Sequence, residues 1–242
     1  MASKLAERHI ELNAQLRVRT VAQLTRIWNS LPEYRDSTLP VWLSNVVPLV
    51  QAAQRAEVAI TQAYLARALD RPVVGIDVDQ VVDNFRKGAA HEQVYTRPFD
   101  AVWTALGNGV PFDAAKEQGL ARATQSAATD IQMAMRDTLT AVGQQEEVIW
   151  GYQRVTDGAA CDFCLLLNGA QFRTEDPMPI HPNCGCGVEP VVYTRTFDGQ
   201  RNLEQFNANP TPPPEGVAVA THGELGPVLG DPSHDFTSES DL

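Results

Sequence analysis

Long apolar runs, an excess of basic charge and dispersed cysteines are all missing from this chain of 242 residues. Nowhere do 18 consecutive apolar residues occur, which excludes a membrane-spanning helix. The first dozen residues are charged and polar, so we expect no secretory leader. The formal net charge of -11 argues against a sequence-specific or general nucleic-acid binder, whose footprint would be basic.

Local catalytic motifs are also missing. The sequence has no Gly-rich phosphate loop, no H-E-x-x-H and no G-x-S-x-G. His9 and His91 fall on helical patterns, where an isolated histidine is typical of a solvated or core-edge position. No convincing Ser/His/Asp group stands out, although triads need not be local in sequence. Local motifs therefore give an enzyme no positive support.

The acidic charge that is present lies mostly in one region. Residues 1–147 carry 15 Lys and Arg against 17 Asp and Glu, and residues 148–196 carry 3 against 5. Residues 197–242 carry 1 against 8, together with six prolines and five glycines. This last region cannot bury enough apolar surface to offset the entropy of ordering it, so we expect it to be largely disordered.

Apolar periodicity predicts helices through the first 145 residues. Pro32 ends the first pattern, Asp77 is a candidate N-cap, and Gly143 is a candidate stop. The expected helices cover 5–31, 40–70, 78–85, 98–106 and 111–142. From Val148 the period changes to alternation, which predicts a strand over 148–153 and further short strands at 171–173 and 188–194. Asp157-Gly158 and Asn168-Gly169 are turn signals.

The predicted fold class is α+β. A mainly helical N-terminal domain (1–146) precedes a small zinc-stapled β-module (147–196) and an acidic tail rich in Pro and Gly (197–242). Within the tail, residues 222–229 are more apolar than their surroundings. They are either a linear motif that folds on binding a partner or part of an inert tether.

All four cysteines fall between residues 161 and 186, which indicates one local site. Cys161 and Cys164 form a C-x2-C turn, whose two sulfurs can bind one ion. His181, Cys184 and Cys186 follow as H-x2-C-x-C, and on a strand the two cysteines would share a face. Five candidates compete for the four places around a tetrahedral zinc, so His181 is either a ligand or a neighbour of the ligands. Because protein groups can fill every place, the zinc is predicted to be structural.

Other interpretations of the cysteines remain open. Four reduced cysteines without a metal are the plain alternative, and a disulfide pair is less expected inside a cell. A nucleic-acid zinc finger does not fit a module with more acidic than basic residues. A module of roughly 45 residues is too small for a sufficient core of its own, which favours a metal staple.

Residues 154–173 read R-V-T-D-G-A-A-C-D-F-C-L-L-L-N-G-A-Q-F-R, and residues 178–190 read M-P-I-H-P-N-C-G-C-G-V-E-P. This segment resembles the Mu F-like minor head protein family of tailed phages, with its C-x2-C knuckle, short L-x-G turn and closing H-P-N-C-x-C. Residues 94–136 and 222–229 resemble actinobacteriophage members. Gly185 stands where a basic residue is usual, which removes a surface charge and leaves the metal interpretation intact.

The resemblance implies a virion component in few copies, in the capsid interior or at the portal vertex, that acts in head assembly or genome ejection. It implies the portal or major capsid protein as partner, and the host cytoplasm as the place of assembly. Actinobacteriophage relatives are often described as capsid maturation proteases, so a protease acting on capsid or scaffold protein is the alternative. A zinc module for host interaction is a third. We expect the non-enzymatic minor capsid protein, because the sequence supplies no nucleophile.

Overall fold

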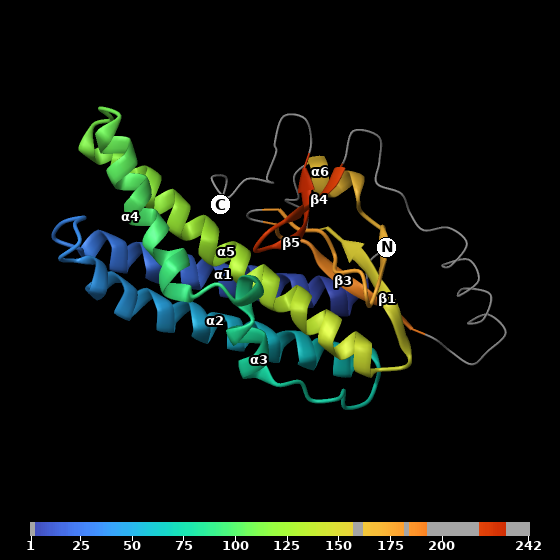
Figure 1. Ribbon diagram of the computed structural model, residues 1–242. Helices are drawn as coiled ribbons and strands as arrows, with labels where there is room; N and C mark the ends of the chain where they lie inside the picture. The colour runs from blue at the N-terminus through green and yellow to red at the C-terminus, as the bar shows by residue number, and fades with distance from the viewer. Residues whose placement is uncertain (1–2, 157–161, 182–183, 193–217, 231–242) are drawn as a thin grey trace.

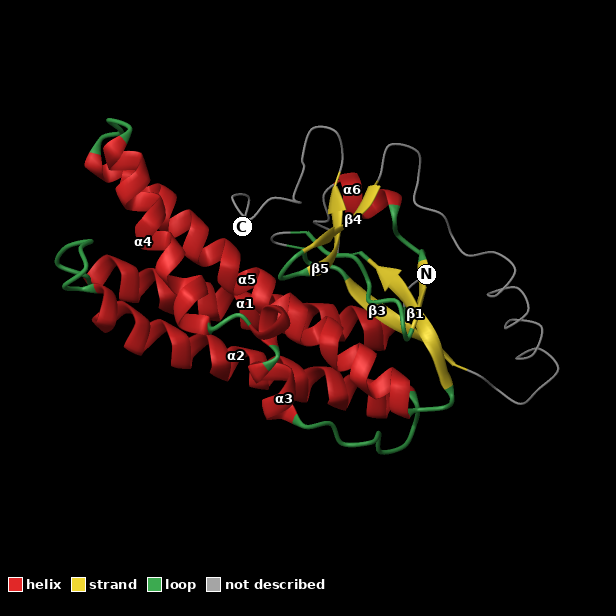
Figure 2. Cartoon of the chain, in the orientation of Figure 1, coloured by secondary structure: helices red, strands yellow, loops and turns green. Residues whose placement is uncertain are grey.

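The computed structural model describes residues 3–156, 162–181, 184–192 and 218–230. Long helices lie side by side, and a small β region packs near one end of them (Figures 1 and 2). The helices are α1 (Lys4–Ser30), α2 (Leu39–Ala68), α3 (Val78–Asp83), the 3-10 turn η1 (Phe85–Gly88), α4 (His91–Gly107), α5 (Phe112–Gln145) and α6 (Asp162–Leu166). The strands are β1 (Ile149–Val155), β2 (Gln171–Arg173), β3 (Gly187–Val192), β4 (Ala218–His222) and β5 (Gly226–Gly230). The expected α+β class is confirmed.

Capping residues and prolines define several helix ends as the sequence predicts. Asp77 caps α3, because its side chain accepts hydrogen bonds from the backbone N–H of Asp79 at 3.0 Å and of Gln80 at 3.2 Å. Pro40 lies in the first turn of α2. No helix in the described ranges has both the length and the hydropathy needed to cross a membrane.

Helix α4 begins earlier than the sequence predicts. The expected start after Pro98 is wrong, because α4 begins at His91 and contains Pro98. The proline removes one backbone hydrogen bond. Val94 and Tyr95, before it, are as fully buried as Phe99 and Val102 after it. The burial of one continuous apolar face outweighs the lost hydrogen bond.

Gly143 is not the stop of the long helix, which runs two residues further to Gln145. A Cβ added at Gly143 would lie 2.6 Å from Thr174 Cγ2 and 2.7 Å from the hydroxyl oxygen of Tyr152. The glycine therefore allows the β region to approach α5 closely. At this close approach, Tyr152 of β1 donates a hydrogen bond to the backbone oxygen of Leu139 in α5 at 2.5 Å.

The first sheet is antiparallel with strand order β2-β1-β3. Its strands match those predicted from alternation to within about two residues at each end. Asn168-Gly169 lies in the turn before β2, where Gly169 has a φ of 85°. The other turn signal, Asp157-Gly158, lies outside the described residues.

Part of the expected disordered tail is folded. Residues 218–230 form an antiparallel hairpin, β4–β5, and Ile180 forms a parallel bridge to Val228. Leu225 and Val228 are fully buried in the same core as α1, α2, α5 and the first sheet. The apolar motif at 222–229 therefore docks on its own chain, and it is neither a tether nor a free linear motif. Residues 197–217 and 231–242 lie outside the described residues.

Two buried clusters hold the helices together. One is aromatic and lies away from the sheet, with Trp28, Trp42 and Phe99 in contact through edge-to-face and tilted rings. The other is shared between helices and sheet, and includes Ile10 of α1, Met135 of α5 and the three described cysteines. The cysteine segment is thus part of a core that the helices help to build.

Candidate metal centre

Sheet pairing brings the two cysteine segments to one place. Strand β1 pairs with β3 so that Val155 lies opposite Gly187. The last residue of β1 and the first residue of β3 therefore lie at the same end of the sheet. Cys184 and Cys186 precede β3 directly. The register therefore explains why Cys184 and Cys186 lie at the sheet end where β1 finishes.

Three thiols converge in the interior at this end. The sulfurs of Cys164, Cys184 and Cys186 all lie within 4.8 Å of one another, and each residue is 1% exposed. The Sγ atoms of Cys164 and Cys184 are 3.9 Å apart. In a tetrahedral site with Zn–S bonds near 2.3 Å, two sulfurs are about 3.8 Å apart. The observed spacing fits a zinc ion.

His181 lies on the edge of this cluster. Its Nε2 is 2.9 Å from Sγ of Cys164, but it does not share the mutual 4.8 Å spacing of the three sulfurs. A sulfur and a nitrogen bound to the same zinc are about 3.6 Å apart. The imidazole therefore lies next to the thiols, where it could supply the fourth ligand.

Arg154 is buried against the thiols, and the sequence pattern did not single it out. It lies on β1 with no exposed surface, and its Nη1 is 3.6 Å from Sγ of Cys164 and 4.0 Å from Sγ of Cys184. Its Nη2 donates to the backbone oxygen of Pro179. The guanidinium carbon is 6.0 Å from the ring centre of Phe172. A cation is thus fixed beside the sulfurs.

The electrostatics of the cluster favour thiolate at Cys184. Hydrogen bonds with Cys164 and then Cys186 lower the pKa of Cys184, and the charge of Arg154 adds to this effect. The hydrogen bond with Cys184 in turn raises the pKa of Cys164. A thiolate, rather than a thiol, is the form that binds metal. The first negative charge of the site is therefore expected at Cys184.

The helices fix the backbone of the closing segment. Arg17 of α1 donates to the backbone oxygen of Cys184, and Gln132 of α5 donates to that of Cys186 at 2.7 Å. Tyr64 of α2 donates to the backbone oxygen of Val188 at 2.8 Å. Three long helices thus hold the backbone oxygens of Cys184 and Cys186, which precede β3, and of Val188 within β3.

The predicted ligands are placed as follows. Cys164, Cys184 and Cys186 are brought together, and His181 contacts Cys164. Cys161 lies outside the described residues. Cys184 and Cys186 precede β3, which begins at Gly187, so the shared face of a strand does not explain their arrangement, yet both side chains reach the same cluster.

A second buried polar cluster links α1 and α2. His9 Nε2 is 3.3 Å from Thr61 Oγ1, which donates to Glu57 Oε1 at 3.1 Å, and Asn13 Nδ2 is 3.3 Å from the same histidine nitrogen. Burial raises the pKa of Glu57 to about 8 and lowers that of His9 to about 4. Thr61 lies between His9 and Glu57 and is fully buried. A catalytic triad instead places the histidine in the middle and exposes the nucleophile, so this cluster is structural.

His91 is also explained by packing. Its Nε2 lies 2.9 Å from Gln54 Oε1, and its ring stacks on Phe85 with centroids 4.2 Å apart. Gln54 of α2 and Phe85 of η1 are both buried. The sequence interpretation of His91 as a core-edge residue agrees with these contacts.

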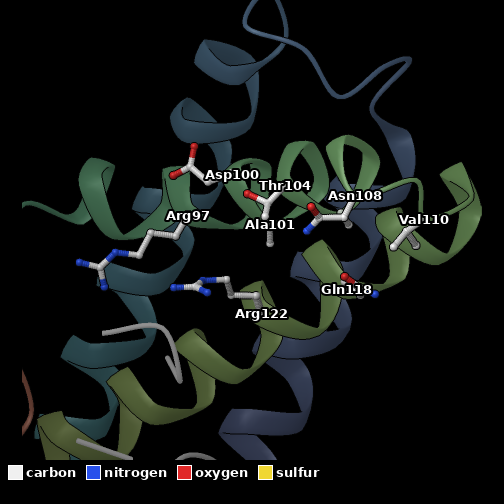
Figure 3. A pocket seen from close by; sticks show the side chains of 9 residues that line it. Arg97, Asp100, Ala101, Thr104, Asn108, Val110, Gln118 and Arg122 are labelled. Carbon is white, nitrogen blue, oxygen red and sulfur yellow. The ribbon is translucent and has the colours of Figure 1, made fainter. Parts of the chain in front are cut away.

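A polar cleft of about 360 Å³ lies between α4 and the start of α5 (Figure 3). The guanidinium groups of Arg97 and Arg122 lie at the same end of it. Arg97 pairs through both terminal nitrogens with Glu224 of the C-terminal hairpin, with Nη1 to Oε2 at 2.9 Å. The chain therefore places one of its own carboxylates at the basic end of the cleft.

Family comparison gives the decisive observation. The model of the VG15 protein family matches residues 1–209. The chain belongs to the VG15 protein family. VG15 is a phage-associated protein family. Comparisons of this VG15 protein with curated proteins and with solved structures gave no significant match.

Proposed function

We propose that this protein is a minor capsid protein of the Mu F-like type that acts in head assembly or genome ejection. The observation that carries the proposal is membership of a phage family over residues 1–209. The H-P-N-C-G-C segment and the C-x2-C turn support the finer assignment, because they are the parts that resemble Mu F-like minor head proteins. The proposed partners are the portal or the major capsid protein, and the proposed location is the virion.

The metal centre has a structural role in this proposal. One zinc ion bound by four of the candidates Cys161, Cys164, His181, Cys184 and Cys186 would join α6 to the start of β3. When bound, zinc supplies no redox chemistry, and a fully protein-ligated site leaves no place for a reacting water. The chain's own residues attach this segment to the helices. Arg17, Gln132 and Tyr64 donate hydrogen bonds to the backbone oxygens of Cys184, Cys186 and Val188.

The experiment is a mass-spectrometric and cryo-electron-microscopic analysis of mature phage particles. The proposal predicts peptides of this chain at a few copies per particle, and density of its size beside the portal. Full-length protein is required, because helices and sheet share a core that truncation would expose. Absence from mature particles would contradict the proposal and favour a protease or scaffold role during assembly.

A further inference from the structure

Arg154 has no carboxylate partner in the described part of the chain. None of the ion pairs there includes it, although it is fully buried. Its Nε finds no hydrogen-bond partner among the described atoms. An isolated buried charge is strongly unfavourable unless an opposite charge compensates it. The groups next to the guanidinium that can become anionic are the sulfurs of the cysteine cluster.

Charge arithmetic links this arginine to the ligand set. A divalent ion with three thiolates and a neutral imidazole has a net charge of about -1, whereas four thiolates leave about -2. One guanidinium neutralises the first centre completely and the second only by half. We propose that Arg154 is the counter-charge of the metal centre and that the ligands are Cys164, Cys184, Cys186 and His181. This inference rests on the proposed zinc site.

The contacts of Arg154 give it a positioning role as well. One of its terminal nitrogens faces the sulfurs of Cys164 and Cys184, and the other donates to the backbone oxygen of Pro179. Pro179 stands two residues before His181. Arg154, on the central strand β1, therefore contacts the sulfurs of Cys164 and Cys184 and also the backbone that leads to His181. Groups in this position around a metal commonly orient the ligands and tune their basicity.

The first test compares Arg154→Met with Arg154→Lys in the full-length protein, using Co²⁺ as the probe metal and a competing chelator to measure affinity. Arg154→Met should bind Co²⁺ roughly 10- to 100-fold more weakly, the usual cost of losing an outer partner of a metal ligand. Arg154→Lys should restore part of the loss, because it keeps the charge. Arg173→Met, on the adjacent strand and half exposed, is the matched control and should bind like wild type.

Metal-free protein separates a counter-charge from an ordinary packing role. Without the metal, removal of Arg154 should lower the melting temperature much less than with it, because the full negative charge of the centre forms only when a metal holds all the thiolates. A packing residue would lower it with and without metal. Unchanged Co²⁺ affinity in Arg154→Met, or an equal loss of melting temperature in both forms, would overturn the proposal. If Arg154→Met does not fold, Arg154→Lys decides. Weaker Co²⁺ binding than wild type would support the role of the guanidinium, whereas wild-type affinity together with a wild-type spectrum would overturn its positioning role.

The second test concerns the ligand set. Cys161→Ser should keep the full sulfur-to-cobalt charge-transfer absorption, whereas Cys184→Ser should lose a share of it. His181→Cys should increase the absorption per bound cobalt, because it adds a thiolate. Loss of absorption in Cys161→Ser with no change in His181→Cys would overturn the three-sulfur assignment while leaving the zinc site itself intact. A wild-type protein that binds no Co²⁺ or Zn²⁺ would instead refute the proposed zinc site.

Discussion

Arg86 and Asp130 form an ion pair in which neither side chain is exposed, with Arg86 Nε donating to Asp130 Oδ1 at 2.9 Å. Tyr95 donates to the other carboxylate oxygen at 2.6 Å. Glu224, on the C-terminal hairpin, accepts from Arg86 Nη1 at 3.2 Å and also pairs with Arg97. The network therefore connects η1, α4 and α5 with the C-terminal hairpin, whose Glu224 lies 138 residues beyond Arg86.

Asp130→Asn tests the buried pair, because it keeps the shape and removes the charge. Breaking a buried ion pair on one side costs about 3–5 kcal/mol. Because Glu224 still faces Arg86 in this variant, we expect a loss toward the lower end of that range. Chemical denaturation of the full-length protein measures the loss. The control is Asp79→Asn, whose pair with Arg55 at 2.9 Å is exposed and should contribute at most about 1 kcal/mol. Equal effects of the two substitutions would contradict the assignment.

The hairpin should contribute to stability through Leu225, which has no exposed surface. Leu225→Ala should lower the free energy of unfolding by about 2–5 kcal/mol, the usual cost of truncating a buried leucine. Val219→Ala on the same hairpin is the control, because Val219 is 46% exposed and should matter little. If Leu225→Ala unfolds at the same denaturant concentration as wild type, the hairpin is not part of the core in solution.

Glu57 should make stability fall as pH rises. Burial raises its pKa to about 8 from 4.5, so the folded chain binds a proton that the unfolded chain releases between these values. His9, with its pKa lowered to about 4 from 6.5, has the opposite slope below pH 6.5. The Glu57 effect should therefore dominate between pH 6.5 and 8, with a slope of up to about 1.4 kcal/mol per pH unit.

Comparison with Glu57→Gln isolates this effect. The glutamine keeps the shape and cannot ionise, so its stability advantage over wild type should grow as pH rises toward 8. Denaturation at several pH values gives the difference directly. A constant difference between the two proteins across this range would mean that Glu57 titrates near its ordinary pKa.

Gly143→Ala distinguishes a packing role from a helix-stop role. In a helix interior, alanine is usually the more stable residue by roughly 1 kcal/mol. Here its Cβ would overlap Thr174 and Tyr152, so we expect the substitution to destabilise the protein by about 1–3 kcal/mol. The double change Gly143→Ala with Thr174→Ser should recover part of the loss. A stabilised Gly143→Ala protein would show that the sheet does not approach α5 as closely as described.

Local sequence patterns predicted the elements but not the contacts between distant segments. Periodicity located α1, α2 and the three strands of the first sheet, because each pattern repeats within a few residues. Pro98 and Gly143 were misread as boundaries, because the packing that outweighs their local preferences comes from other parts of the chain. The hairpin at 218–230 was not predicted for a related reason. A segment with few apolar residues among prolines and glycines has the composition of a tether, and the core surface that buries Leu225 and Val228 is formed by distant parts of the chain.

The cysteine cluster could be predicted only as far as the spacing of the cysteines allows. Cysteine spacing identified Cys164, Cys184 and Cys186, since knuckle motifs place ligands close together in sequence. Arg154 gave no signal, because an arginine on a short strand is ordinarily solvent-exposed. Its role depends on β1 lying between β2 and β3, and that order follows only from the folded sheet.

Metal content of the purified full-length protein tests the central claim most directly. Elemental analysis should find about one zinc per chain, the stoichiometry of a closed four-ligand site. Removal by a chelator should lower the stability of the sheet region, because metal binding energy at such a site is folding energy. Cys184→Ser should retain less of the metal than wild type, whereas a serine in place of an exposed residue such as Val219 should retain it in full. A zinc-free protein whose near- and far-ultraviolet circular dichroism is unchanged by chelator would contradict the account.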